Sequence, residues 1–256
     1  KKRKIEIKEL KSVNPSIWSE YQESLRLVEC GSTFIRFSDR FKLTAYGKLN
    51  TYALFAELSK DLSHGKGRSG IIVPSGILSD DSTKAFFGEC FTKARIISAV
   101  SFENEEFIFK GIANVNKFTA LTLGDRPDSE DAEFAFYIRR VEQIRETMRY
   151  FSLSQEDLKN INPNTRTCPV FRSEVDAELT KKIYRRTPVL IDENMGENGN
   201  PWGVTFRQGL FNMASDSSCF RTLRDFEEND AVPAGTDWVL SNGERYVRLY
   251  EGKFVW

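Results

Sequence analysis

The 256-residue sequence is poor in the residues from which most metal and redox sites are built. It has a single histidine, His64, and four cysteines that form no Cys-x-x-Cys pair: Cys30, Cys90, Cys168 and Cys219. Zinc sites draw on closely spaced cysteine and histidine ligands, so sites of this kind are all but excluded. Widely scattered cysteines are typical of reduced thiols, and we therefore expect a cytoplasmic protein that holds no metal.

The sequence also lacks long apolar runs and an excess of charge of either sign. No apolar stretch reaches the ~20 residues of a membrane span, and the charged first residues are unlike a signal peptide. We therefore expect no membrane partner. The 37 Lys and Arg residues balance 37 Asp and Glu residues, so any surface that binds nucleic acid must be local.

Short catalytic motifs are missing too. The sequence contains no P-loop, no His-Glu-x-x-His helix and no Gly-x-Ser-x-Gly elbow. His64 follows a predicted helix, in a glycine-rich segment where a solvent-facing loop residue is expected. The acidic pair Asp80-Asp81 stands at a predicted helix start, where capping and the helix dipole account for it. Taken singly, the residues name no reaction.

The most informative stretch is Gly65–Lys84, which reads GKGRSGIIVPSGILSDDSTK. Its three consecutive apolar residues, 71–73, favour a strand buried on both faces, as in a parallel sheet covered by helices. Ser79 or Asp80 can cap a helix that follows. Open α/β sheets bind ligands at the carboxyl ends of such strands, so the turn at Pro74–Gly76 marks a candidate site edge.

Other elements can be placed around this strand. Asn14-Pro15 predicts a helix start and Gly31 its end, and Asn50 or Thr51 caps a further helix. The segments expected to be extended are Phe34–Phe37, Phe41–Leu43, Ile96–Phe102, Phe118–Leu123 and Phe134–Ile138. The strands at 96–102 and 118–123 are joined by a short connection, which favours an antiparallel pair.

A polar break at Gly124–Asp131 is the clearest boundary in the chain. Beyond it, helices are expected at Val141–Met148, after Ser154 and at Asp176–Arg186. The last fifty residues contain scattered aromatics and many loop-forming residues. No repeat or low-complexity tract is visible.

Taken together, these segments resemble the amino-group DNA methyltransferases of restriction–modification enzymes that fuse both activities in one chain. The segments that carry the resemblance are collinear and cover nearly the whole chain: Asn50–Phe55, Gly70–Ile77, Asp80–Phe87, Phe102–Asn104, Phe109–Gly111, Lys117–Leu123, Asn162–Ser173, Asp176–Arg186, Asn200–Phe206 and Arg248–Phe254. Members of this family have a Rossmann-like sheet, bind S-adenosylmethionine and methylate the exocyclic amine of adenine.

The resemblance implies an α/β fold: the closing half of a Rossmann-like methyltransferase sheet, followed by an irregular α+β segment. The implied division is 1–124 for the second half of the methyltransferase domain, 125–175 for a connecting segment and 176–256 for the start of the target-recognition region. Two family motifs are absent, namely the cofactor loop and the Asn/Asp-Pro-Pro-aromatic motif, and no Pro-Pro pair occurs. We therefore expect a fragment of the enzyme, inactive by itself, with both motifs upstream of Lys1.

The resemblance also implies roles for individual residues. Phe109 stands where the family places an aromatic against the flipped-out adenine, and such a pocket needs an apolar or π surface. Lys117, next to the following strand, is expected to contact a phosphate, although a plain surface lysine explains it as well. Phe55 matches an aromatic near the adenine of S-adenosylmethionine, the implied cofactor. From the residues alone, Phe55 and Phe109 are equally consistent with core positions.

The expected DNA-contacting residues are Arg172, Lys181, Lys182, Arg185 and Arg186, although a solvated helix face explains them as well. The implied partners are double-stranded DNA and either a nuclease or the N-terminal methyltransferase portion. An open sheet edge also suits self-association. The alternative function is a non-catalytic DNA-binding or assembly subunit derived from half a methyltransferase.

Overall fold

The computed structural model describes residues 2–63, 67–127, 130–206, 212 and 214–249. It contains two compact units, residues 1–202 and 203–256. The functional division expected from the sequence, 1–124, 125–175 and 176–256, is a different one and stays a prediction. None of the helices in the described residues is long and apolar enough to cross a membrane.

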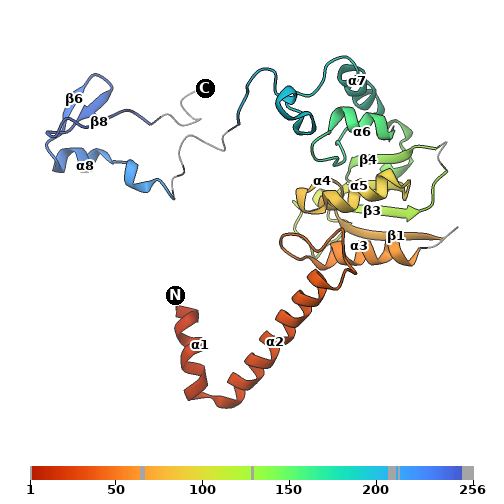
Figure 1. The fold of residues 1–256 in the computed structure, drawn as a ribbon, viewed down its shortest axis with the longest axis horizontal. Coiled ribbons are helices and arrows are strands. Elements are labelled where there is room, and N and C mark those ends of the chain that lie inside the picture. The colour runs from red at the N-terminus through yellow and green to blue at the C-terminus, as the bar shows by residue number, and fades with distance from the viewer. Residues whose placement is uncertain (1, 64–66, 128–129, 207–211, 213, 250–256) are drawn as a thin grey trace. The chain divides into compact units, whose positions relative to one another are not determined.

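The first unit is built on a five-stranded mixed sheet in the order β1-β3-β2-β4-β5 (Figure 1). The strands are β1 (Arg68–Pro74), β2 (Ile96–Glu103), β3 (Lys117–Gly124), β4 (Ala132–Ile138) and β5 (Tyr150–Leu153). β3 is antiparallel to both β1 and β2, which confirms the predicted antiparallel pair, and β2 is parallel to β4. The mixed α/β class is thereby confirmed.

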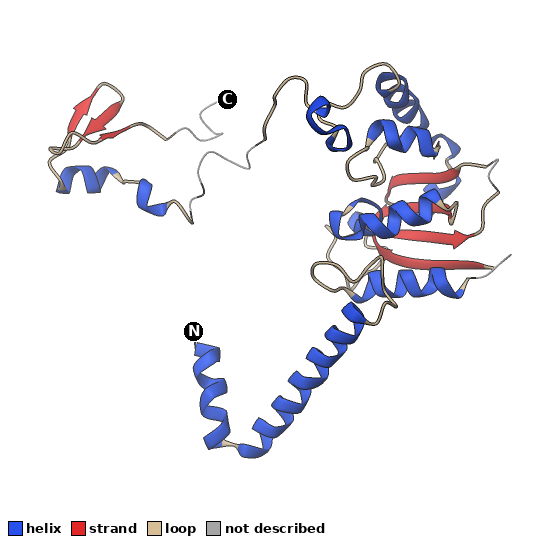
Figure 2. Ribbon diagram, viewed as in Figure 1, coloured by secondary structure: helices blue, strands red, loops and turns tan. Residues whose placement is uncertain are grey.

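Helices cover one face of this sheet, which we call the first face (Figure 2). They are α3 (Thr51–Leu62), α4 (Gly76–Ser79), α5 (Lys84–Thr92), α6 (Gln155–Ile161) and α7 (Glu174–Tyr184). Phe87 and Phe91 pack there against Phe134, and these three rings and that of Phe86 are almost fully buried. Burial of such rings stabilises the fold by roughly 2 kcal/mol each, so this layer is the main core.

The opposite side of the sheet, the second face, is much less covered. One row across it reads Ile72, Ala120, Val100, Ala135 and Tyr150 from β1 to β5. Within this row only Ala135 is fully buried, and Ile72 is 61% exposed. The prediction that residues 71–73 form a strand buried on both faces is wrong, because β1 lies at the edge of the sheet and one of its faces is open.

The segment before the sheet is helical rather than partly extended. It forms α1 (Lys2–Val13) and α2 (Pro15–Phe37), and α2 runs through Gly31 without ending there. The extended segments predicted at 34–37 and 41–43 are therefore wrong. The apolar residues near 34–37 continue the helical spacing, and Arg36 near the end of α2 donates hydrogen bonds to the Ala45 and Gly47 carbonyl oxygens at 3.1 and 2.6 Å.

The chain after β3 continues the same sheet. β4 pairs with β2, and β5 pairs with β4, so the polar break at 124–131 separates strands of one sheet. The helix expected at 141–148 consists instead of two short 3-10 turns, Val141–Arg145 and Thr147–Arg149.

The second unit contains α8 (Leu223–Glu228) and a small antiparallel sheet of β6 (Val232–Ala234), β7 (Asp237–Val239) and β8 (Arg245–Tyr246). Phe226 stacks on Trp238 with ring centroids 5.2 Å apart, and this pair forms the centre of a small core.

Candidate functional site

The carboxyl ends of β1, β2 and β4 lie at one edge of the sheet, together with the start of β3. Pro74 pairs with Phe118, Glu103 with Lys117, and Phe102 with Ile138, so these ends are neighbours across the strands. We call this the carboxyl edge. Ligands of open α/β sheets bind at the carboxyl ends of parallel strands, and several sequence-predicted residues meet here.

Phe109 lies at this edge, in the loop 107–116 between β2 and β3. Its ring is 40% exposed and meets Phe118 edge to face, with centroids 4.8 Å apart. Phe118 in turn stacks on Phe102 at 5.0 Å. Phe109 is therefore not a core residue, because it is exposed while its ring contacts Phe118. That arrangement can accept a second flat ring.

Lys117 and Glu103 form the polar part of the carboxyl edge. Glu103 is 8% exposed, and Lys117 and Arg139 bind its two carboxylate oxygens at 2.8 and 3.0 Å. The hydrogen bond from Lys117 lowers the pKa of Glu103, and that from Arg139 adds to it against the opposing effect of burial. Arg139 was not predicted from the sequence, because a lone arginine after a strand carries no local signal.

Tyr137 joins these cations to a distant loop. The Lys117 Nζ lies 5.4 Å from the centre of its ring, and the Arg172 guanidinium lies 5.2 Å from the same centre. Tyr137 has a φ of 60°, a left-handed conformation that costs free energy for a tyrosine and often marks a functional site. Lys117 and Arg172, predicted separately, thus meet at one aromatic ring.

The basic residues predicted on α7 divide into two groups. Lys181 is 7% exposed and donates to the Ser152 carbonyl oxygen at 2.6 Å and to Glu178 at 2.7 Å, with Asp157 3.6 Å away. Its ammonium is fully engaged inside the fold. Arg185 also binds Asp157, at 3.0 Å. Burial acts to raise the pKa of Asp157, but hydrogen bonds from Ser154 and the two cations outweigh it and lower the pKa.

Lys182 and Arg186 are exposed and remain available at the surface. Lys182 shares a surface hollow with other charged and apolar residues of α7: Glu174, Val175, Glu178, Leu179 and Arg185. This surface therefore carries carboxylates as well as cations, and it is less basic than the residue run at 181–186 indicates.

Phe55 lies on α3 with 64% of its surface exposed, so the core alternative is wrong for it as well. Its neighbours Leu54 and Ala56 are buried, as are Ala53 and Glu57. An exposed aromatic on a helix that packs against β1 is compatible with a cofactor contact, and that role stays a prediction.

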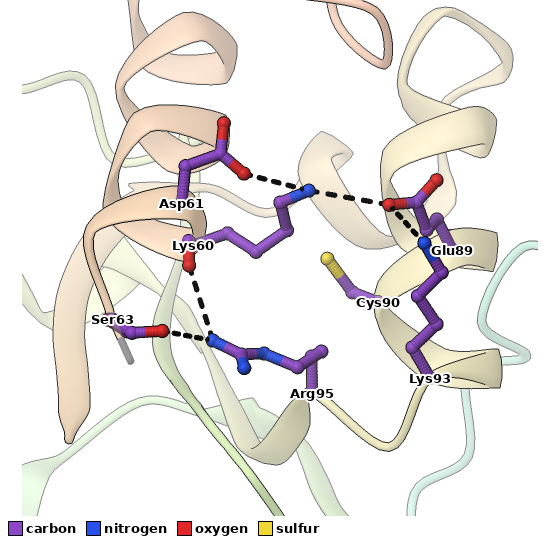
Figure 3. Close-up of a pocket in the computed structure, with 7 residues that line it drawn as sticks. All are labelled: Lys60, Asp61, Ser63, Glu89, Cys90, Lys93 and Arg95. Carbon is purple, nitrogen blue, oxygen red and sulfur yellow. Dashed lines mark hydrogen bonds and ion pairs between the residues drawn. The ribbon is translucent and has the colours of Figure 1, made fainter. Parts of the chain in front are cut away.

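A second group of charged residues lies at the other end of the strands (Figure 3). Arg95 donates to the Lys60 and Ser63 carbonyl oxygens at 3.2 and 2.6 Å, and so binds the last carbonyls of α3. Lys60 pairs with Asp61 and Glu89 at 3.0 and 3.4 Å. These charges are paired with one another, and their ion pairs join α3 to α5.

Some sequence-based predictions cannot be placed. His64 lies outside the described residues, as does most of the segment Arg248–Phe254. Within the described residues, no group of three or more His, Cys, Asp or Glu side chains is arranged to hold a metal ion.

Comparison with known proteins gives one structural similarity to report. No family model matches the sequence, and no curated protein matches it. The methyltransferase subunit of a type I restriction-modification system from Streptococcus thermophilus is similar in structure, with a TM-score of 0.38 and 16% sequence identity. The match covers 55% of this chain and 35% of that chain, about a third of the subunit's length.

Proposed function

We propose that this chain forms the base-accepting part of an S-adenosylmethionine-dependent adenine DNA methyltransferase. The observation that carries the proposal is the half-exposed Phe109 ring, which is backed by Phe118 at the same sheet edge as Lys117 and Arg172. A ring supported on one side and open on the other can stack on an extruded adenine. Stacking of this kind contributes about 1–3 kcal/mol per base.

The cations at the same carboxyl edge fit the backbone of the same DNA strand. Lys117 is half-exposed and Arg172 is exposed, and both lie over Tyr137. Phosphate contacts of this kind position the strand, while the aromatic ring receives the base. Lys182 and Arg186 extend the contact onto α7. Lys181 is left out of the proposal because its ammonium is bound within the fold.

The chemistry itself requires residues that this sequence lacks. In the proposed mechanism, the amine of the flipped adenine is held by a side-chain amide or carboxylate and a backbone carbonyl of a prolyl motif. S-adenosylmethionine, when bound, would supply the methyl group, which the amine nitrogen would take directly from the sulfonium with loss of a proton. Neither the prolyl motif nor the cofactor loop occurs in these 256 residues. A further methyltransferase segment must therefore supply both.

The second face of the sheet is the proposed place for that segment. Ile72 on this face is 61% exposed, and β1 is an antiparallel edge strand that pairs with β3 alone in the described part of the chain. A strand whose sequence is typical of a buried one lies at an open edge. A layer packed there would bring its cofactor loop to the carboxyl edge.

The proposal is tested by separating base binding from phosphate binding. Two single strands are compared by fluorescence anisotropy: one of deoxyadenosine, about twelve nucleotides long, and one of equal length and charge without bases. We expect the adenine strand to bind about tenfold more tightly, a ratio equivalent to ~1.4 kcal/mol of stacking.

The variant Phe109→Ala should remove this preference, whereas Phe107→Ala, an exposed phenylalanine of the same loop, should keep it. The variant Lys182→Ala should weaken both strands equally, since phosphate contacts do not distinguish bases. Equal binding of the two strands by the wild type would contradict the proposal.

The second candidate is a non-catalytic DNA-binding subunit. The same exposed cations fit DNA binding, and the absence of the cofactor loop and the prolyl motif fits a subunit without catalysis. It predicts that no added methyltransferase segment restores methyl transfer. Transfer of a labelled methyl group to DNA, measured after adding a segment that carries both motifs, separates the two candidates.

A further inference from the structure

Asn104 is a fully buried polar residue at the carboxyl edge. It directly follows β2, its exposed surface is 0%, and it stands at the start of the connection that carries Phe109. A buried amide is costly unless its donors and acceptor are paired. Where those groups are directed therefore shows what the residue does.

Every polar group of this side chain is directed at the loop 107–116. Its Nδ2 donates to the carbonyl oxygens of Phe109 and Ile112 at 3.0 and 2.9 Å, with the Ala113 carbonyl oxygen 3.5 Å away. Its Oδ1 accepts a hydrogen bond from the Phe109 backbone N–H at 2.9 Å. Asn104 thus binds both the N–H and the C=O of Phe109.

The backbone of Asn104 closes the same loop. Its N–H donates to the Asn116 carbonyl oxygen at 3.1 Å, and its carbonyl oxygen accepts from the Phe107 N–H at 2.9 Å. Phe107 has a φ of 52°, a conformation that needs such support. One residue therefore joins the two ends of the loop and its centre.

We infer that Asn104 is a positioning residue that fixes the Phe109 ring in its base-accepting place. This inference rests on the proposed function for its purpose, but the loop geometry stands without it. A primary amide is the side chain that can donate twice and accept once at this distance from the backbone. Aspartate keeps the acceptor and loses the donors, and leucine loses all three bonds.

The test uses two readouts on the full chain. Amide hydrogen exchange reports whether the loop is held, without any ligand. The ratio of affinities for the adenine strand and the strand without bases, defined above, reports whether Phe109 is presented to a base. The variants are Asn104→Leu and the nearly isosteric Asn104→Asp, which serves if the leucine variant fails to fold. Asn116→Leu, at an exposed asparagine of the same loop, is the matched control.

We expect the Phe109 amide to exchange about tenfold faster or more in both Asn104 variants, with the amides of β3 unchanged. The ratio of affinities for the adenine strand and the strand without bases should fall close to one in both Asn104 variants. It should stay at the wild-type value in Asn116→Leu. A merely structural residue would alter exchange without changing the ratio, and that result would overturn the inference, as would unchanged exchange.

A different result is expected if the proposed function is wrong. In that case the wild type itself would show no preference for the adenine strand, while the Asn104 variants would still lose protection from hydrogen exchange in the loop. Asn104 would then be a structural residue only, and the inference would fall together with the function.

Discussion

At the scale of single residues, the carboxyl edge is governed by how each polar group is paired. Glu103 is almost buried and bound by two cations, while Lys117 and Arg139 remain about half-exposed. The carboxylate therefore holds the cations in place at the edge, and Arg139 also pairs with Glu105 at 2.9 Å.

Glu103→Gln should weaken stability in a pH-dependent way. The folded-state pKa of Glu103 is lowered by Lys117 and Arg139, so the ionised carboxylate stabilises the fold above its ordinary pKa of about 4.3. This contribution is lost as the pH falls through the lower, folded-state value. Urea unfolding should show a wild-type advantage of about 1 kcal/mol at neutral pH, limited by the exposure of the cations.

That advantage should shrink steadily below about pH 4. Glu106→Gln, at an exposed neighbour of the same turn, serves as the control and should have no such effect. A difference that grew on acidification would refute the assigned role of Glu103.

The cysteines should divide into two reactive and two protected thiols. Cys30 and Cys219 are exposed, whereas Cys90 and Cys168 are buried. Burial raises the pKa of Cys90 to about 12 and that of Cys168 well above its ordinary value. Iodoacetamide labelling of the native protein, followed by peptide mapping, should modify only Cys30 and Cys219. Labelling of all four before unfolding would contradict the described core.

At the scale of elements, α6 and α7 are joined by a buried ion pair rather than by apolar contacts alone. Lys181 and Asp157 have 7% and 5% of their side chains exposed. Removing one partner of a buried pair is costly because the other is left uncompensated. Lys181 therefore stabilises the fold, although it lies in a run of basic residues on α7.

Lys181→Met should lower the free energy of unfolding by about 3 kcal/mol. The matched variant Lys182→Met, at the exposed neighbouring lysine, should change it by less than ~0.5 kcal/mol. Denaturant unfolding of both variants measures the difference. Equal effects would show that Lys181 is not part of the buried pair in solution.

The sequence predicted several elements well and others poorly, for identifiable reasons. The helix at 51–62 and the strands at 96–103 and 117–124 have clear caps and patterns, and the structure confirms them. Residues 34–37 were misassigned because four mainly apolar residues fit a strand and a helix equally. Lys181 and Asn104 carry no local signal at all, since their partners come from distant or irregular segments.

At the scale of the whole molecule, the sheet has one complete layer and one open face. The strand at 68–74 was expected to be buried because its residues are apolar, and its exposure in the structure reflects an edge with no partner strand in the described chain. An apolar pattern indicates that a strand is suited to pack against another apolar surface. The segment that supplies this surface need not belong to the same chain. The proposed second methyltransferase segment fits this open face.

The isolated chain should not bind S-adenosylmethionine tightly. Under the proposed function the cofactor loop comes from another segment, and Phe55 alone offers a single aromatic surface. Calorimetric titration of the full chain should therefore give no site of micromolar affinity. A micromolar site would show that these 256 residues hold a cofactor pocket by themselves.

The position of the bound base tests the central claim most directly. A deoxyadenosine strand carrying one 8-azidoadenine is bound to the full chain and irradiated, and the cross-linked peptide is identified by mass spectrometry. The account predicts cross-links within residues 107–118, abolished by Phe109→Ala and retained in Phe107→Ala. Cross-links concentrated on the second unit, or unaffected by Phe109→Ala, would contradict it.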